Sequence, residues 1–450
     1  IMIDNIKLAN YKSFFADQVK EAIDEQQKIN RSQMRNLFKT GELSLAYVDS
    51  IQHETGMIIL KCPRRMAPRL KVLKGVCIIK KGAKQALGEH VTEWICRWDE
   101  FVDNKDFHSS GSDMTPMYYV HTGDSNYDYV ACSGFSFKLY DILSKALVDG
   151  KSLSLIVHNP FPPVEYFCNL ASYMDAFSSN DELNLEPTID YEEWTPEELA
   201  FDEQKPTGIS DTIIDTLANE HCCIVQGPPG TGKSYTIASV ISSYLDAGKT
   251  VCVTTMANKG LIELIKQKPL QKYVKEGRVS KTNLSIDERK QVSGVKAASA
   301  DLQVPGGEML CATNYQLSSV FSEKKMTLYG LPQYDLVVIE EASQAFLTAI
   351  VAFKQLGIDC LIVGDPMQLP PIVKLNNPQY NSWNVATQVE GLKSMVLGTS
   401  IKSYRIVTTF RLTSRSASLT KCFYGNRFVS VKQDYLDFTK ANSVLFPQDG

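Results

Sequence analysis

The chain has 450 residues, of which 44% are hydrophobic and 22% charged, and its formal net charge is −4. This length predicts about two to four domains, and an aromatic content of 10% excludes a wholly disordered chain. The slightly acidic balance excludes a globally basic protein, so any nucleic-acid site has to be a local patch. No apolar run reaches the roughly 18 residues that a membrane helix needs, so we expect no membrane partner. Eleven cysteines without zinc-type spacing favour reduced thiols and a cytoplasmic protein.

The character of the sequence changes along the chain. Residues 1–40 are polar and predict a helical segment, and residues 41–105 alternate β-rich runs with turn-formers, which indicates a small barrel-like domain. Residues 106–180 have the pattern of a mixed α/β segment. Residues 181–204 carry ten acidic side chains and no basic one, which is typical of a solvated acidic connector.

Residues 205–450 alternate strand and helix patterns. Short apolar runs stand at 222–226, 250–255, 336–339 and 360–363, and each leads into polar or glycine-containing sequence and then a helical spacing. Runs of this kind without polar alternation belong to strands that are buried on both faces. The sequence therefore predicts an α/β fold with a parallel sheet and helices on both of its faces.

A phosphate-binding loop follows the first of these strands. Residues 227–234 read GPPGTGKS, which matches GxxxxGK[ST] between a strand and a helix. Its backbone amides can surround a phosphate, Lys233 can reach the β- and γ-phosphates, and Ser234 can bind Mg²⁺. The alternative is a glycine-rich turn without a ligand, which a full match in this context disfavours. The residues expected to contact ATP or GTP are Gly227, Pro228, Pro229, Gly230, Thr231, Gly232, Lys233, Ser234 and Tyr235.

Two further strand ends carry polar residues. The run DLVVIEEASQA (335–345) ends its strand in Glu340 and Glu341, where one carboxylate can hold Mg²⁺ and its neighbour can orient or deprotonate the attacking water. The alternative is the solvated start of a helix. The run GDPMQLPP (364–371) places Gln368 where it can sense a γ-phosphate, and its alternative is a proline-rich turn.

The order of these motifs over residues 205–430 resembles superfamily 1 helicases, in the branch of the nonsense-mediated-decay helicase and senataxin. The resemblance implies a RecA-like P-loop ATPase domain at 205–450, with ATP and Mg²⁺ as cofactors. In TTMANKGL (254–261) and CATNYQLS (311–318) it implies nucleic-acid contacts by Asn258, Lys259 and Thr313. In TTFR (408–411) it implies that Phe410 stacks on adenine and that Arg411 reaches the γ-phosphate.

The chain departs from the family pattern at three places. Glu340 stands where the family has aspartate, and its extra methylene is expected to alter Mg²⁺ coordination. No glutamine occurs at 207–212, where the family reads adenine. Only 39 residues follow Arg411, so we expect the family's second RecA-like domain, which completes the motor, to be missing.

A basic run provides a candidate nucleic-acid surface. Residues 55–88 hold nine basic side chains and no acidic one, with Arg64, Arg65 and Arg69 at the centre. Such a local charge can bind phosphates and make the affinity salt-dependent. A solvated loop is an equally good interpretation of this run.

The leading hypothesis is an ATP-dependent helicase or translocase (an EC 3.6.4-type ATPase) that moves on single-stranded DNA or RNA and hydrolyses ATP to ADP and phosphate. Two alternatives remain open: a nucleotide-dependent nucleic-acid-binding switch without translocation, and an AAA-type ATPase that remodels proteins. Stimulation of ATP hydrolysis by single strands separates them.

Overall fold

The computed structural model describes residues 2–40, 44–52, 54, 57–63, 76–79, 90, 118–120, 126–132, 154–157, 164–284, 286–322, 325, 330–373 and 385–432. The chain divides into two compact units. The large unit comprises residues 1–16, 165–284 and 288–450, and the small unit comprises 17–164 and 285–287. Among the helices of the described ranges, none is both long and apolar enough to span a membrane.

The small unit contains a six-stranded antiparallel sheet in the order β3-β6-β1-β2-β5-β4. Its strands are β1 (Ser44–Gln52), β2 (Met57–Pro63), β3 (Val76–Ile79), β4 (Tyr118–Val120), β5 (Tyr127–Cys132) and β6 (Ser154–Val157). Segments 41–105 and 106–180 thus contribute to one sheet. In the described strands this sheet has two edges, β3 and β4, so the barrel expected for residues 41–105 is not shown.

The large unit is built on a nine-stranded sheet whose neighbouring strands all pair in parallel, which confirms the predicted α/β class. The strand order is β11-β10-β12-β9-β13-β14-β8-β15-β7. The strands are β7 (Glu197–Leu199), β8 (Cys222–Gln226), β9 (Val251–Thr255), β10 (Val279–Lys281), β11 (Lys296–Ala297), β12 (Met309–Thr313), β13 (Tyr334–Ile339), β14 (Gly357–Gly364) and β15 (Lys402–Ile406). Because the strands are parallel, the loops that follow them meet at one carboxyl edge.

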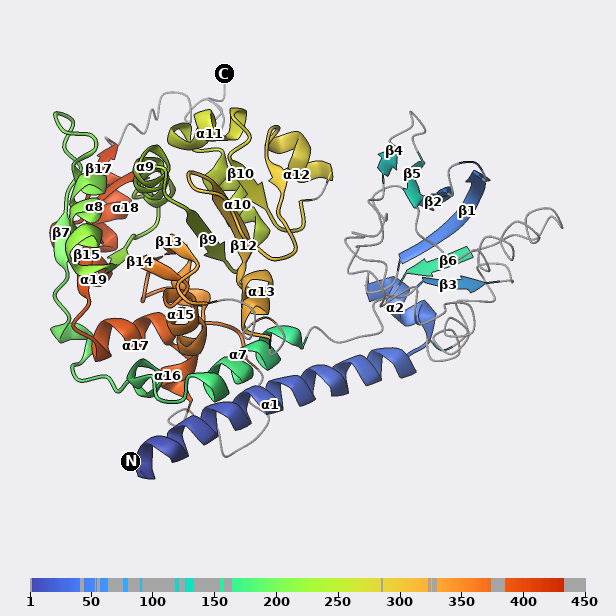
Figure 1. Ribbon diagram of the computed structural model, residues 1–450, viewed down its shortest axis with the longest axis horizontal. Coiled ribbons are helices and arrows are strands. Elements are labelled where there is room, and N and C mark those ends of the chain that lie inside the picture. Colours follow the sequence, from blue (N-terminus) through green and yellow to red (C-terminus); the bar gives the residue numbers. More distant parts are fainter. Residues whose placement is uncertain are drawn as a thin grey trace, which may run out of the picture. The chain divides into compact units, whose positions relative to one another are not determined.

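Helices cover both faces of this sheet (Figure 1). On one face, the apolar sides of α8 (Gly208–Glu220), α9 (Lys233–Asp246) and α10 (Asn258–Ile265) share a core with one side of the strands. On the other face, a second core gathers α7 (Glu165–Ala176), α15 (Leu347–Lys354), α17 (Gly391–Gly398) and the first half of α1 (Met2–Arg31). Its aromatic centre includes Phe14 and Phe346, with ring centroids 6.1 Å apart. The central strands β8, β9 and β12 are therefore buried at every position, as predicted for strands covered on both faces.

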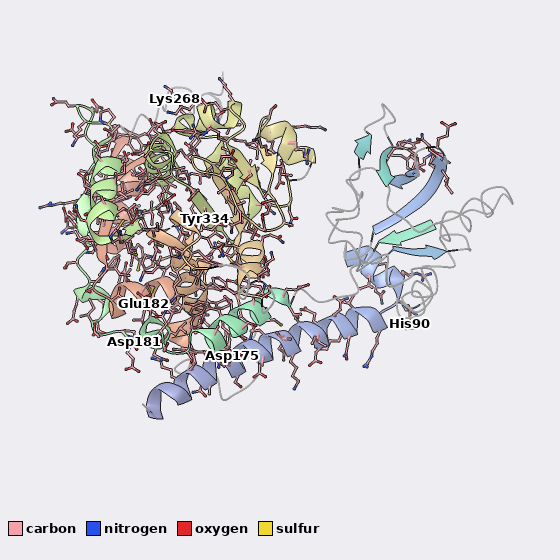
Figure 2. The ribbon with its side chains drawn as sticks, viewed as in Figure 1. His90, Asp175, Asp181, Glu182, Lys268 and Tyr334 are labelled. Carbon is pink, nitrogen blue, oxygen red and sulfur yellow. The ribbon has the colours of Figure 1, made fainter. Side chains whose placement is uncertain are left out.

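The helical N-terminal segment is present as α1 and α2 (Met34–Thr40). The acidic stretch 181–204 follows α7 and is part of the large unit, with 3-10 turns η1 (Asp181–Asn184) and η2 (Tyr191–Glu193) and the edge strand β7. Its apolar side chains Leu183 and Trp194 are buried, while Glu182, which is labelled in Figure 2, pairs with Lys354 of α15. The acidic composition did not predict this packing, because a few buried apolar residues are enough to anchor a stretch whose acidic side chains are exposed.

Shorter elements complete the large unit: η3 (Lys268–Leu270), α11 (Gln271–Lys275), α12 (Ile286–Gln291), α13 (Asn314–Leu317), η4 (Ser318–Phe321), η5 (Ala342–Gln344), α16 (Ala386–Val389), β16 (Thr408–Thr413), α18 (Ser414–Leu419), α19 (Lys421–Tyr424) and β17 (Val429–Lys432). Strands β16 and β17 form a separate two-stranded parallel sheet.

Candidate nucleotide and strand site

The phosphate loop connects the fully buried strand β8 to α9, in the strand–loop–helix context that the motif requires. A Cβ at Gly227 would lie 2.1 Å from Cδ of Lys233, so glycine is needed for the lysine to pass across the loop. Gly230 has a φ of 79°, and a Cβ there would lie 2.3 Å from Cβ of Arg411. The two glycines therefore fix both the course of the loop and the approach of the lysine.

The acidic pair after β13 faces this loop. Nζ of Lys233 lies 3.8 Å from Oε1 of Glu341, and Oγ of Ser234 donates a hydrogen bond of 3.3 Å to Oε1 of Glu340. Strand β14 separates β8 from β13 in the sheet, so the four side chains meet across the carboxyl edge. The structure thus brings together the phosphate loop and the acidic pair, which lie more than a hundred residues apart.

Glu340 is an unusual carboxyl group. Its side chain is 4% exposed, and burial raises its pKa to about 7, with a further contribution from the neighbouring charge of Glu341. Lys233 and the hydrogen bond from Ser234 act in the opposite direction. In the described part of the chain, its buried Oε2 has no hydrogen-bond partner. A hydroxyl and a carboxylate with an unused oxygen are the donors that Mg²⁺ takes beside nucleotide phosphates, so these residues fit the ion.

Glu341 adopts a backbone conformation that is rare for a residue with a side chain. Its φ is 53°, in the left-handed region, directly before η5. This conformation costs on the order of 1–3 kcal/mol and recurs at functional sites. Its side chain is partly exposed and lies near Lys233, whereas that of Glu340 is buried. The two carboxylates therefore occupy different environments.

The loop after β14 carries Gln368 and a buried network that the sequence did not indicate. The amide of Gln368 donates to the carbonyl of Asp365 at 2.9 Å, and its side chain is half-buried. The carboxylate of Asp365 is fully buried and accepts hydrogen bonds from Gln226 Nε2 at 3.0 Å and Tyr424 OH at 2.8 Å. Gln226 in turn accepts from Nε of Arg405 at 2.6 Å. The network ties the ends of β8, β14 and β15 together below the phosphate loop.

The segment TTFR lies in β16 and touches the phosphate loop from the other side. The amide of Phe410 donates to the carbonyl of Gly230 at 2.8 Å, and the hydroxyl of Thr409 donates to the carbonyl of Pro229 at 3.2 Å. Phe410 also meets Phe201 edge to face, with centroids 5.0 Å apart. A pocket of about 680 Å³ opens here. Phe410, Arg411, Tyr235 and residues 230–232 of the loop line it, together with Phe201, Pro206 and Ile209, which sequence reasoning missed.

The three predicted strand-contacting residues lie at the same carboxyl edge but have different surroundings. Thr313 at the end of β12 is in register with Thr255 at the end of β9, and its hydroxyl caps α13. Asn258 begins α10 and accepts a hydrogen bond of 2.8 Å from Nζ of the fully buried Lys281. Lys259, by contrast, is exposed. Two of the three side chains therefore make intramolecular bonds.

Arg64, Arg65 and Arg69 lie outside the described residues. Within the described ranges, the acidic and sulfur side chains form no group of three or more ligands suited to a metal ion. A Mg²⁺ ion at this site would therefore be bound by Ser234, by Glu340 and by phosphate oxygens of the nucleotide.

Comparisons with known proteins find one family model and several distant similarities. Residues 210–374 match the family model described as "AAA domain". The chain is 29% identical over 245 residues to the DNA replication ATP-dependent helicase/nuclease dna2 of Schizosaccharomyces pombe, covering 50% of this chain and 16% of that protein. It is 26% identical over 205 residues to DNA2 of Saccharomyces cerevisiae, covering 42% of this chain and 12% of that protein. The UvsW helicase of bacteriophage T4 aligns with a TM-score of 0.29 and 9% identity, over 55% of this chain and 80% of that one.

Residues 210–374 thus form a P-loop ATPase domain, the kind of domain that binds ATP, and the chain is distantly similar to these helicase/nucleases. This match confirms the predicted P-loop ATPase domain. The matched region spans less than a fifth of each of these two relatives.

Proposed function

We propose that this protein is an ATP-dependent translocase or helicase on single-stranded nucleic acid. The observation that carries the proposal is the meeting of Lys233, Ser234, Glu340 and Glu341 at the carboxyl edge of the parallel sheet. The relatives are named as DNA replication ATP-dependent helicase/nucleases, which supports a nucleic-acid substrate. The proposed reaction is hydrolysis of ATP to ADP and phosphate, coupled to movement along a strand.

The proposed roles follow from the contacts. The loop amides and Lys233 bind the β- and γ-phosphates, because a cation that is only 14% exposed loses little strength to solvent. Glu341, which is accessible and separate from the buried Glu340, accepts the proton of the attacking water. Gln368 senses the γ-phosphate from the end of β14. A Mg²⁺ ion held by Ser234 and Glu340 would neutralise phosphate charge in the transition state.

The remaining parts of the site serve the base and the strand. Phe410 stacks on the base, and Arg411 supplies positive charge near the γ-phosphate. Lys259 contacts a backbone phosphate of the strand, while Asn258 and Thr313 hold the loops that present it. We further propose that a second RecA-like domain completes the cleft over ATP, since motors of this class draw transition-state charge from a facing domain.

The test is the rate of ATP hydrolysis by the 450-residue chain with and without single-stranded DNA or RNA. Stimulation by one of the strands supports the proposal, whereas displacement of a duplex oligonucleotide is expected only when the second RecA-like domain is supplied. A rate that ignores both strands would favour a protein-remodelling ATPase instead.

A nucleotide-dependent binding switch is the second candidate, and Glu340 favours it. Glu340 is buried where the family has aspartate, and its extra methylene changes how the carboxylate can approach Mg²⁺, which would slow turnover. Tight strand binding that requires ATP, without measurable hydrolysis, is the result that this candidate predicts.

A further inference from the structure

Strand β9 lies between the strand that ends in the acidic pair and the strand that leads into α13. It pairs with β13 on one side and with β12 on the other (Figure 1). Thr254, near its carboxyl end, is in register with Ile339 of β13 and with Ala312 of β12. The carbonyl of Thr254 accepts a hydrogen bond of 2.8 Å from the amide of Glu340. One residue of β9 is therefore bonded directly to the residue that is proposed to hold Mg²⁺.

The side chain of Thr254 connects the same position to the loop after β12. Its hydroxyl donates a hydrogen bond of 2.7 Å to Oδ1 of Asn314, the first residue of α13. Both side chains are fully buried, so water does not compete for this bond. The preceding residue, Thr313, caps α13 and is one of the predicted strand-contacting residues. Two consecutive hydrogen bonds thus join Glu340 to the start of α13.

The other end of the Asn314 amide is not used. Its Nδ2 is buried and, among the residues that the structure describes, has no hydrogen-bond partner. Leaving a buried donor unsatisfied is destabilising, so stability alone does not explain an asparagine here. A hydroxyl can donate or accept, and an amide has one group of each kind, so this pair has two bonded arrangements related by a half-turn of the amide. An element with two arrangements is what an interaction between separate sites requires.

Helix α10 reaches the same carboxylate from another direction. A Cβ on Gly260, in its first turn, would lie 3.7 Å from Oε2 of Glu340 and 3.3 Å from Cγ2 of Thr255. This Oε2 is the buried oxygen that has no hydrogen-bond partner in the described part of the chain. Lys259, the proposed phosphate contact, immediately precedes the glycine. Glu340 is therefore linked to α10 by this close approach and to α13 by hydrogen bonds.

We propose that Thr254 and Asn314 are positioning residues through which a bound strand accelerates ATP hydrolysis. A strand bound by Lys259 and by the loop after β12 moves the first turns of α10 and α13. The two hydrogen bonds transmit this movement to Glu340, because close-packed side chains leave little room for independent movement. This inference rests on the proposed function, since it assigns the residues that link the two proposed ligands.

The test is the stimulation factor, the ratio of the ATP hydrolysis rates of the 450-residue chain with and without a saturating single strand. Thr254→Val keeps the shape of the side chain without its hydroxyl, and Asn314→Ala removes the amide. Each should lower the factor by about threefold or more, the size of effect that residues between two coupled sites produce. The basal rate should stay near the wild-type value, because the carbonyl that bonds Glu340 belongs to the backbone. Thr254→Ser, which keeps a hydroxyl, should retain the stimulation.

The chain contains a chemically matched control. The hydroxyl of Thr348 donates to Oε1 of Gln388 at 3.0 Å, and both side chains are fully buried. Nε2 of Gln388 likewise has no hydrogen-bond partner within the described ranges. This pair joins α15 to α16 rather than two strand ends. Thr348→Val should therefore lose similar stability in urea unfolding but keep the wild-type stimulation factor.

The outcomes separate this inference from the proposed function. A wild-type stimulation factor in both Thr254→Val and Asn314→Ala overturns the inference and leaves the proposed function intact. An equal fall of the basal and the stimulated rates would assign the pair a purely structural role and overturns the inference as well. A wild-type chain that neither single-stranded DNA nor RNA stimulates overturns the proposed function and this inference with it.

Discussion

The carboxyl edge of the large sheet has two halves that are organised differently. In the nucleotide half, after β8, β13 and β14, Lys233 and Glu341 face each other, and among the described residues a buried oxygen of Glu340 has no hydrogen-bond partner. In the strand half, after β9 and β12, Asn258 and Thr313 are bonded within the fold, and only Lys259 is exposed. The first half is arranged to receive a ligand. In the strand half, Asn258 and Thr313 stabilise the loops, and Lys259 is the side chain available for contact with a nucleic-acid strand.

The largest effect expected in the nucleotide half comes from Lys233→Ala. Removing the cation that faces the phosphates should reduce turnover by about 10²-fold or more. The rate of phosphate release at saturating ATP is the measurement. Lys249→Ala, at an exposed lysine just before β9 on the opposite edge of the sheet, is the control that should keep wild-type turnover. Wild-type activity in Lys233→Ala would refute the assignment of the nucleotide half.

Glu341→Gln should separate binding from hydrolysis. The amide keeps the size of the side chain but cannot accept the proton of water, so the turnover rate should fall by about 10²-fold, with ATP affinity preserved. Equilibrium binding of a fluorescent ATP analogue and single-turnover hydrolysis report the two quantities. If Glu340→Gln gives this phenotype and Glu341→Gln does not, the roles of the two carboxylates are reversed.

The buried Glu340 predicts a pH-dependent stability. Its pKa is raised from 4.5 to about 7 in the folded protein, so the folded state binds this proton more tightly than the unfolded state. Stability is therefore lost as pH rises from about 4.5 to about 7, and the loss is complete above that range, at a cost on the order of 3 kcal/mol. Glu340→Gln cannot ionise and should be more stable than the wild type at pH 8, with little difference at pH 4.5.

Urea unfolding without divalent ions at the two pH values measures this difference. The exposed Glu220 provides the control, because Glu220→Gln should show no such gain at pH 8. Equal free energies of unfolding for the wild type and Glu340→Gln at pH 8 would show that burial does not penalise the charged carboxylate.

The smallest expected effect lies in the strand half. Lys259→Ala should weaken single-strand binding and lower the slope of log affinity against log salt by about 0.7, the value for one phosphate contact. Fluorescence anisotropy with a labelled oligonucleotide at several salt concentrations measures both quantities, and Lys275→Ala is a matched exposed control. An unchanged slope would remove Lys259 from the strand contact.

The difference between the halves also explains what the sequence could predict. The phosphate loop is contiguous, and its backbone conformation follows from its own glycines, so the motif located it and its helix correctly. The bonding partner of Asn258 is Lys281, the last residue of strand β10, and no local pattern connects the two. The same holds for Asp365 and Arg405, whose network forms only when three strand ends meet.

The sequence did not predict the packing of the acidic stretch against the large unit, nor the pocket beside the phosphate loop, for a related reason. Strand β7 has three residues, too few for a periodic signal, and it is defined by its pairing with β15. Phe201 follows it within the run whose acidic composition predicted a solvated connector, and Pro206 lies just beyond that run. Their position in the pocket depends on the distant Phe410, which meets Phe201 only in the folded chain.

The central claim is that one sheet edge couples nucleotide to strand. The most direct measurement is the affinity of Glu341→Gln for a single-stranded oligonucleotide with and without saturating ATP, together with its ATP affinity with and without the strand. Coupling predicts that each ligand changes the affinity of the other by the same factor, about fivefold or more. Strand affinity that is identical with and without ATP would contradict the account.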